Sequence, residues 1–463
     1  MGYRLREMVG ARNFAAEIKL DVLSRVVPAE TVQAALAAEG VITQRARKLT
    51  VEAAVYVLIA MNLFPHLSMA DVVAKLAQGL RYVWPDPEVP VATASALTYR
   101  RAQVGARPVV ALFHQVCRPL ATPQTKGAFR FGLRLMAIDG TTEDVADTPA
   151  NAAVFGRHHS QRGASAFPQV RGVYLTECGT HAIVDAGFWP CHTSERVGGR
   201  RLLRSITAGM LVLWDCGFHE YDLLVGVRQR RAHALGRLPA HVKPQRVRTL
   251  ADGSYLAYLR PADSQRRKHG ERLLVRIIAY TVTDPALVGY GELHRLVTTL
   301  LNPVLAPALE LACAYHERWE SEVVIDELDT HQRLAARTLR SLTPVGVIQE
   351  LYALLIAHYA VRTLMHEAAL HAAVDPDRLS FVGAVRVLQN ALPEFQMTAP
   401  DDLPLLYRRL LRDIAAKRLP LRRFRVNPRV VKRKMSNFPL KRPAHSHPPR
   451  LQGSFCDRLA LVI

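Results

Sequence analysis

Three side chains in one stretch of the sequence could together bind a phosphate group and a metal ion. Tyr315, Arg318 and Glu322 are spaced i, i+3 and i+7 within residues 315–331, so a helix there would project all three from one face. A guanidinium forms paired hydrogen bonds with a phosphate, and a carboxylate is a ligand for hard cations such as Mg²⁺. Taken alone, the stretch also fits an amphipathic helix with a solvated Glu/Arg face.

Two aspartates upstream favour the metal-binding interpretation. Asp139 ends the apolar segment Leu-Arg-Leu-Met-Ala-Ile, and Asp215 ends Met-Leu-Val-Leu-Trp, with a glycine within two residues of each. Both segments are typical of a buried strand that runs into a tight turn. Carboxylates at the ends of neighbouring strands, with a third on a helix packed against them, could hold a pair of divalent ions about 4 Å apart.

The three segments resemble the DDE transposases of the insertion-sequence-four family, bacterial enzymes with a ribonuclease-H-like catalytic core. Asp139-Gly-Thr resembles the family's first-aspartate motif, and Asp215-Cys-Gly-Phe resembles its second. Tyr315-x-x-Arg318-x-x-x-Glu322 matches the family's Tyr-Arg-Glu pattern, which is the most specific part of the resemblance. The resemblance spans most of the chain.

Several functional expectations follow from this resemblance. Asp139, Asp215 and Glu322 would be the catalytic residues and the metal ligands, holding two Mg²⁺ ions for which Mn²⁺ can substitute. Tyr315 and Arg318 would contact DNA. The partners would be the double-stranded terminal inverted repeats of a mobile element and a target DNA, bound by a homodimer. The reaction would be cut-and-paste transposition: Mg-dependent cleavage at the element ends, through a DNA hairpin, and then strand transfer.

One position departs from the family pattern. Six residues after Glu322 the family has a Lys that is thought to touch DNA, whereas this chain has Asp329. The departure leaves open a degenerate copy that binds DNA without completing transposition. A ribonuclease-H-like nuclease of different use and a basic DNA-binding protein without catalysis are further alternatives. Terminal inverted repeats flanking the gene would favour the transposase interpretations over a protein without catalysis.

The composition fits a DNA-binding protein of the bacterial cytoplasm. The 463 residues include 61 Lys and Arg against 40 acids, a net charge of +21 that favours a polyanionic partner. The longest apolar run, residues 53–64, is too short to span a bilayer, and the N-terminus lacks the apolar core of a signal peptide, so no membrane partner is expected. The six cysteines are scattered without a CxxC pair, so neither a zinc site nor a disulfide framework is expected.

The first 127 residues show helical apolar spacing. A helix over residues 93–105, started by a Thr and followed by a Gly turn, carries Arg100 and Arg101. It could be the second helix of a helix-turn-helix whose arginines contact DNA. A packing helix with two solvated arginines fits the same pattern. The resemblance favours the DNA-binding interpretation, since the family's N-terminal helical domain binds transposon ends.

The pattern changes to strands from residue 129. A first strand over residues 129–139, a hairpin over residues 170–189, a helix and the strand before Asp215 follow the order of a ribonuclease-H-like core, which would place the Asp139 strand beside the Asp215 strand. Alternating runs between residues 246 and 280, separated by a charged turn at 265–271, predict a β-rich insertion. The predicted fold class is therefore α/β: a mixed-sheet core with a β-rich insertion, flanked by N- and C-terminal helical regions.

The chain ends in helices and a basic tail. Residues 345–373 predict a long core helix, and two further helices follow. Residues 417–450 hold 12 Lys or Arg and no acid, including Lys432, Arg433 and Lys434, which are expected to contact DNA unless the tail is simply solvated. The predicted domains are 1–127 (DNA-binding), 128–340 (catalytic, with the insertion at about 240–295), 341–416 (helical) and 417–463 (basic tail).

Overall fold

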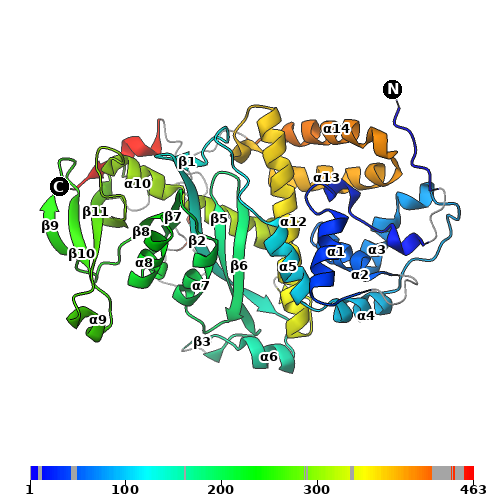
Figure 1. Ribbon diagram of the computed structural model, residues 1–463, viewed down its shortest axis with the longest axis horizontal. Helices are drawn as coiled ribbons and strands as arrows, with labels where there is room; N and C mark the ends of the chain where they lie inside the picture. The colour runs from blue at the N-terminus through cyan, green and yellow to red at the C-terminus, as the bar shows by residue number, and fades with distance from the viewer. Residues whose placement is uncertain are drawn as a thin grey trace. The chain divides into compact units, whose positions relative to one another are not determined.

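The chain forms two compact units (Figure 1). The computed structural model describes residues 2–8, 13–42, 49–160, 163–285, 287, 290–333, 338–419, 440, 442–443 and 453–462. Unit 1 comprises Met1–Ala128, Gly140–Ser194 and Ser321–Arg418, and unit 2 comprises Phe129–Asp139, Glu195–Glu320 and Leu419–Ile463. Each unit is thus assembled from segments that are far apart in the sequence.

Unit 1 begins with the helices that the sequence predicts. They are α1 (Ala29–Ala38), α2 (Val51–Ala60), α3 (Met69–Ala77), α4 (Ala94–Val104) and α5 (Arg107–Val116), with 3₁₀ turns at Phe14–Ala16, Asp21–Leu23 and Leu80–Tyr82. Thr50, Ser68 and Thr93 start three of these helices, because each side-chain oxygen accepts a hydrogen bond from a first-turn N–H. α2 is buried along almost its whole length, which accounts for the longest apolar run in the sequence.

The predicted hairpin lies in unit 1, where the strands run in the order β6-β5-β2. Its strands β5 (Gln169–Glu177) and β6 (Ala182–Pro190) pair antiparallel. The second half of β2 (Leu133–Val145) also pairs in parallel with the short β13 (Thr338–Leu339). The smaller elements of this unit are α6 (Pro149–Phe155), β3 (His159–Ser160) and β4 (Gly163–Ala164).

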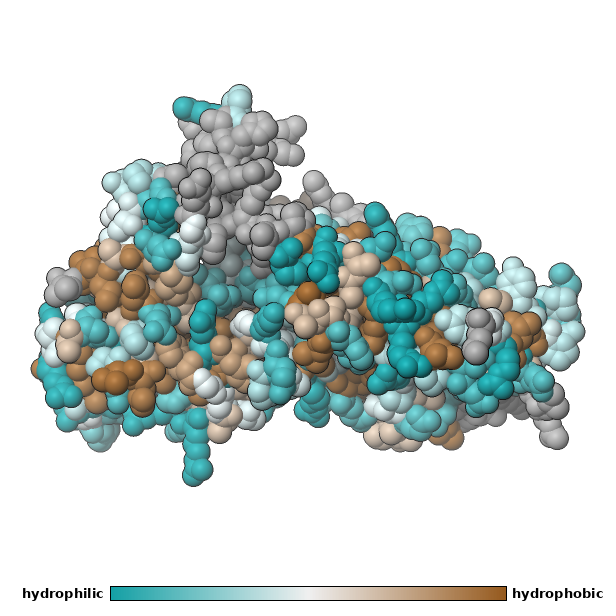
Figure 2. Space-filling model, turned by 90° about the horizontal axis from the view of Figure 1, so that it is seen from above, coloured by the Kyte–Doolittle hydropathy of each residue, from teal (hydrophilic) through white to brown (hydrophobic). Residues whose placement is uncertain are grey.

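The helix α12 (Pro344–His371) forms the core of unit 1. Its buried side chains contact α2, α5, α13 (Phe381–Met397) and α14 (Leu403–Ala415). α12 is long and apolar enough to cross a membrane, yet 72% of its most apolar stretch is buried inside the protein, as in a core helix. Figure 2 shows one face of the molecule, on which hydrophobic residues form patches broken by hydrophilic ones.

Unit 2 is built on a mixed sheet whose strands run in the order β2-β7-β8-β12-β11-β10-β9. β2, β7 (Met210–Trp214) and β8 (His233–Arg237) are parallel, and the Asp139 strand lies beside the Asp215 strand, as predicted. The connecting helices are α7 (Glu195–Leu202) and α8 (Tyr221–Gln229), with 3₁₀ turns at Leu203–Ser205 and Cys216–Phe218. Gly236 of β8 is needed because a Cβ there would lie 2.3 Å from the Trp214 indole nitrogen.

The predicted first strand is interrupted near its start. Phe131 and Gly132 both have positive φ angles, 54° and 71°, so the backbone turns sharply there. The short β1 (Phe129–Arg130) folds back antiparallel on β2 through this turn. The predicted continuous strand over residues 129–139 is therefore a tight hairpin followed by the long strand that carries Asp139.

The β-rich insertion extends the sheet of unit 2. It consists of β9 (Gln245–Thr249), β10 (Tyr255–Leu259), β11 (Leu273–Val282) and β12 (His294–Thr298), and β12 pairs with β8 as expected for a strand that returns to the core. The predicted charged turn instead contains the short helix α9 (Ser264–Lys268), because Asp263 caps the N–H of Arg266. α10 (Ala308–His316), α11 (Trp319–Asp326), a 3₁₀ turn (Phe455–Arg458) and β14 (Leu459–Leu461) follow. The predicted fold class, an α/β ribonuclease-H-like core with a β-insertion and flanking helical regions, is confirmed.

Candidate active site

Asp139 and Asp215 extend adjacent parallel strands of unit 2. Ala137 of β2 is paired with Leu213 of β7; Asp139 follows two residues later within β2, and Asp215 follows two residues later in extended backbone just after β7. Residues two apart in a strand point to the same face, and neighbouring strands lie about 4.8 Å apart. The two carboxylates therefore emerge from the same face of the sheet, Asp139 from the middle of β2 and Asp215 just after the carboxyl end of β7. This arrangement agrees with the one predicted from the two apolar segments.

The turn after Asp215 is held by the aspartate itself. Its Oδ1 atom accepts a hydrogen bond of 2.9 Å from the N–H of Gly217, which starts the 3₁₀ turn Cys216–Phe218. A Cβ at Gly217 would lie 3.1 Å from that oxygen and 3.2 Å from Oε2 of Glu195. Glu195 thus brings a third carboxylate of unit 2 close to the Asp215 turn. Only the packing of α7 beside this turn reveals its position.

Tyr315 and Arg318 also belong to unit 2, but they do not share one continuous helix. α10 ends at His316, and Arg318 lies in the turn before α11. The Arg318 Nη1 atom donates to Oδ2 of Asp139 over 3.3 Å. Burial raises the pKa of Tyr315, whose residue is 7% exposed, while the charge of Arg318 opposes that rise. The predicted continuous helix over residues 315–331 is therefore interrupted at residues 317–318.

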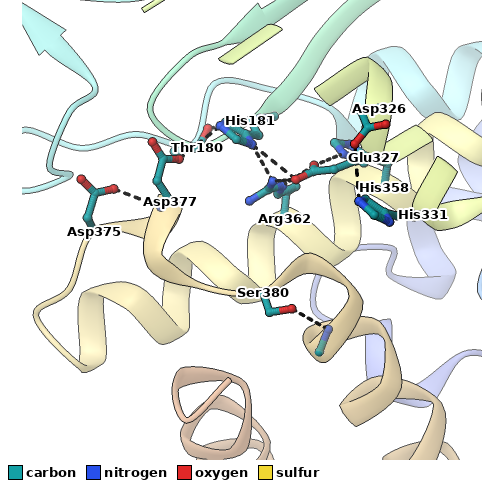
Figure 3. A network of polar contacts seen from close by, with 12 residues as sticks. Thr180, His181, Asp326, Glu327, His331, His358, Arg362, Asp375, Asp377 and Ser380 are labelled. Atoms are coloured by element: carbon teal, nitrogen blue, oxygen red, sulfur yellow. Dashed lines mark hydrogen bonds and ion pairs between the residues drawn. The ribbon is translucent and has the colours of Figure 1, made fainter. Parts of the chain in front are cut away.

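Glu322 lies in the part of α11 that belongs to unit 1. A buried ion pair fixes the segment that follows α11. Glu327 begins a π-helical segment (Glu327–Gln332), and its carboxylate accepts hydrogen bonds from Arg362 and, at 3.0 Å, from Nε2 of His358, both on α12 (Figure 3). Arg362 also donates to Nδ1 of His181. These contacts hold the pKa of Glu327 well below its usual range, despite burial that opposes ionisation.

The sequence did not identify Glu327 as a positioning residue. His358 and Arg362 were expected to be polar points on a helix that packs in the core. They are nearly fully buried in α12, and both bind the carboxylate that anchors the end of the α11 segment. Two basic residues four apart within the largely apolar stretch of residues 351–365 were the available signal, because buried charges are almost always paired.

Asp329, which occupies the position of the family's Lys, lies near the buried carboxylate of Glu143. Arg333 lies 3.8 Å from Oδ1 of Asp329 and also pairs with Glu143 on β2. Burial is the main cause that raises the pKa of Asp329, to about 8, and the nearby Glu143 adds to it. Burial and the neighbouring Glu143 thus both disfavour negative charge on Asp329 at this position.

The other predicted DNA contacts have different surroundings. Arg101 is half-buried in unit 1 and donates to Ser341 Oγ over 3.0 Å, while Arg100 donates to Gln103 over 2.6 Å. Burial lowers the pKa of Arg101. Lys432, Arg433 and Lys434 lie outside the described residues.

A disulfide, which the sequence did not suggest, lies in unit 2. It joins Cys313 of α10 to Cys456, whose Cα atoms are 5.5 Å apart. The pairing spans 143 residues of sequence, so no local cysteine motif could reveal it. The expectation of no disulfide framework is wrong at this pair, which fixes the C-terminal segment to the helix that carries Tyr315.

The carboxylates of unit 2 fit a divalent metal ion. Asp139 and Asp215 offer hard oxygen donors from one face of the sheet, which suits the preference of Mg²⁺ and Mn²⁺ for oxygen ligands. Arg318, which already binds Asp139, supplies a guanidinium that can bind the phosphate whose charge the metal would also neutralise. The arrangement is suited to phosphoryl transfer.

Comparisons with known proteins point to the same chemistry. The family model described as "Insertion element 4 transposase N-terminal" matches residues 17–114, and "Transposase DDE domain" matches residues 130–360. The chain is 28% identical over 422 residues to the transposase InsG for insertion sequence element IS4 of Escherichia coli K12, covering 89% of this chain and 91% of that protein. It is 34% identical over 153 residues to the putative transposase InsZ of the same organism, covering 32% and 49% of the two chains.

A solved structure is also similar to the chain at low identity. The cryo-EM structure of the piggyBac transposase synaptic complex with hairpin DNA aligns with a TM-score of 0.42 and 13% identity, covering 91% of this chain and 88% of that one. The family matches do not favour the alternative of a copy without transposase function. The chain belongs to the IS4 family of DDE transposases, DNA-binding enzymes that break and rejoin phosphodiester bonds by hydrolysis and transesterification with the help of divalent metal.

Proposed function

We propose that Asp139, Asp215 and Glu322 are the catalytic carboxylates and that they hold two Mg²⁺ ions, for which Mn²⁺ can substitute. The observation that carries this proposal is the placement of Asp139 and Asp215 on one face of two adjacent parallel strands. Glu322 enters through the Tyr-Arg-Glu pattern and is held in unit 1 on the segment that Glu327 anchors. When bound, the two metal ions would activate the attacking oxygen and stabilise the leaving 3′ oxygen.

The chain's own residues position the DNA. Arg318 turns its guanidinium fork from Asp139 to a phosphate oxygen next to the cut, and the buried Tyr315 supports the turn that presents Arg318. The 3′ hydroxyl released by cleavage then attacks target DNA at the same carboxylates, so no covalent enzyme intermediate is needed. Excision through a DNA hairpin, as the family resemblance implies, would use the same groups.

The remaining parts of the chain would bind the two DNA substrates. Residues 1–127 would bind the terminal inverted repeats, with Arg100 and Arg101 as candidate contacts, and Lys432, Arg433 and Lys434 would contact the phosphate backbone. The catalytic domain would span residues 128–340, with the helical region 341–416 supporting it and 417–463 as a basic tail. A homodimer would hold two element ends in the bacterial cytoplasm, since transposition joins both ends.

Cleavage of a labelled duplex that carries the element's own end tests this proposal. Nicking should require Mg²⁺, stop with chelator, and be lost in Asp139→Ala while DNA binding stays within about twofold of the wild type. Asp144→Ala removes a carboxylate from the same strand and should nick normally, because Asp144 instead accepts a hydrogen bond from Gln169. Nicking by Asp139→Ala at the wild-type rate would refute the assignment.

Asp329→Lys is the next protein to make if the wild type binds the end without nicking it. The substitution restores the cation that the family resemblance places there, next to Glu143 and Arg333. Recovered nicking would locate the defect at residue 329. An inactive Asp329→Lys protein would place it elsewhere in the chain.

A further inference from the structure

A cavity on unit 2 lies outside the proposed catalytic site. It has a volume of about 300 Å³, at the lower end of the range of small-ligand sites. It lies where α8 meets β8, two elements that pack side by side (Figure 1). Its lining residues come from the end of α8, the start of β8 and the neighbouring strands β11 and β12: Arg228, Arg231, Ala232, His233, Leu274, Thr299 and Leu301.

Two cations of this cavity have no acidic partner among the residues that the structure describes. Arg228 and Arg231 are exposed and take part in no side-chain hydrogen bond or ion pair within the described ranges. Elsewhere in unit 2, Arg266 binds Asp222 and Glu271, and Arg276 binds Asp252. The two guanidiniums of the cavity therefore remain available for an anion.

The backbone presents Arg231 in an uncommon conformation. Its φ is 56°, in the left-handed region that non-glycine residues rarely adopt. The N–H of Arg231 donates to the carbonyl of Arg228 over 2.9 Å, and the N–H of Ala232 donates to that of Val227 over 3.2 Å. This turn closes α8 and brings the two arginines to the same end of the helix, beside the start of β8.

Polar groups on the strands complete the lining. Thr299 Oγ1 accepts a hydrogen bond of 3.0 Å from the N–H of Ala234 and lies 3.4 Å from Nδ1 of His233. Either the hydroxyl or Nδ1–H can be the donor in this contact, since the neutral ring carries one proton on one of its two nitrogens. Burial lowers the pKa of His233, which agrees with a neutral ring. The partly buried Leu274 and Leu301 supply apolar wall between these groups.

The cavity is at the opposite end of the strands from the aspartates. His233 is paired with Leu211 at the start of β7, whereas Asp215 follows Trp214, which is paired with Gly236. His233 and Arg237 stand at the two ends of β8, four residue steps or about 13 Å apart along the strand. A ligand in the cavity would therefore bind without using Asp139 or Asp215.

We propose that this cavity is an anion site that takes one phosphate group between Arg228 and Arg231. Guanidiniums bind phosphate oxygens through paired, charge-assisted hydrogen bonds, and the imidazole of His233 adds a polar group to the lining. The phosphate is either part of a DNA backbone that passes this edge of the sheet or part of a free phosphate compound. The site itself stands independently of the proposed catalytic carboxylates.

Inorganic phosphate is the first probe, measured by titration calorimetry on the full chain. The wild type should bind it saturably, and Arg228→Gln/Arg231→Gln should bind it at least tenfold more weakly. Arg230→Gln is the matched control, because Arg230 lies between the two but donates to the carbonyl of Gly226 at 3.0 Å. Equal phosphate affinity in the double variant and the wild type, or no saturable binding by the wild type, overturns the proposal.

The salt dependence of DNA binding identifies the source of the phosphate. If the site holds a backbone phosphate, the slope of log K against log salt for a duplex of arbitrary sequence should fall by about 0.9 in the double variant and not in Arg230→Gln. An unchanged slope, with phosphate binding lost, assigns the site to a free phosphate compound.

Two further proteins keep the test decisive. Arg228→Lys/Arg231→Lys keeps both positive charges but removes the paired guanidinium donors, so it should bind phosphate with intermediate affinity. This variant keeps the proposal testable if the Gln double variant misfolds. Asp139→Ala should bind phosphate as the wild type does. Failure of the anion site would thus be seen separately from failure of the proposed catalytic assignment.

Discussion

The Arg318 guanidinium lies 3.3 Å from Oδ2 of Asp139 and donates a hydrogen bond to it, with both side chains largely buried. The cation therefore occupies an oxygen that a metal ion would also use. Binding of metal at Asp139 must displace or share this contact, while a DNA phosphate offers Arg318 a new partner. If Asp139 binds metal and Arg318 binds DNA, as proposed, this contact links the two events within unit 2.

Replacing Arg318 should lower the Mg²⁺ concentration that nicking requires and also lower the maximal rate of nicking. In Arg318→Gln, Asp139 loses its competing cation, so nicking should reach half its maximum at a Mg²⁺ concentration at least about twofold lower. The maximal rate should fall about tenfold or more, which corresponds to about 1.4 kcal/mol of lost transition-state binding. Mg²⁺ titration of nicking measures both, with Arg230→Gln as the control. A higher Mg²⁺ requirement in Arg318→Gln would contradict this competition.

Breaking the buried Glu327 ion pair should strongly destabilise the protein. Glu327→Gln leaves Arg362 buried without a compensating charge, and loss of one partner of a buried pair typically costs about 3–5 kcal/mol. Denaturant unfolding measures the change. Asp326→Asn lies one residue away but is exposed and paired with His331, so it should cost less than about 1 kcal/mol. Equal effects of the two substitutions would show that Glu327 does not anchor the segment after Glu322.

Asp329 should make stability fall as the pH rises. Its pKa is about 8 in the folded protein against an ordinary 3.8, so the folded state holds the proton more tightly than the unfolded state. The associated stability is complete below about pH 4 and is lost progressively up to about pH 8. Asp329→Asn removes this titration, so its free energy of unfolding relative to the wild type should increase across that window. Denaturant unfolding at several pH values measures the difference, and a difference that does not vary with pH would contradict the assignment.

The disulfide between Cys313 and Cys456 should stabilise the protein only under oxidising conditions. A cross-link that closes a loop of this length typically contributes about 2–4 kcal/mol, in part by restricting the unfolded chain. Cys456→Ser should lower the free energy of unfolding by that amount without reductant and have little effect with dithiothreitol. Cys216→Ser, which alters an exposed free cysteine, is the control. The same loss with and without reductant would instead assign the effect to packing of the C-terminal segment.

Much of this protein is determined by local sequence. The apolar runs before Asp139 and Asp215 located the two strands, because continuous apolar segments must be buried. The predicted turn follows Asp215 but not Asp139, where β2 continues through Gly140 to Val145. Capping residues such as Thr50 and Ser68 marked helix starts. The Tyr315, Arg318 and Glu322 spacing identified the family, whose chemistry is carried by residue types rather than by their exact helical geometry.

Tertiary structure decided the features that depend on groups far apart in the chain. The helix break at residues 317–318, the approach of Glu195 to the Asp215 turn and the pairing of Glu327 with Arg362 all depend on which elements pack together. The same is true of the Cys313–Cys456 bond, which spans 143 residues. Local patterns report on burial and backbone conformation, whereas the partner of a buried charge or thiol is set by the fold, because it is chosen among all the surfaces that the core brings within bonding distance.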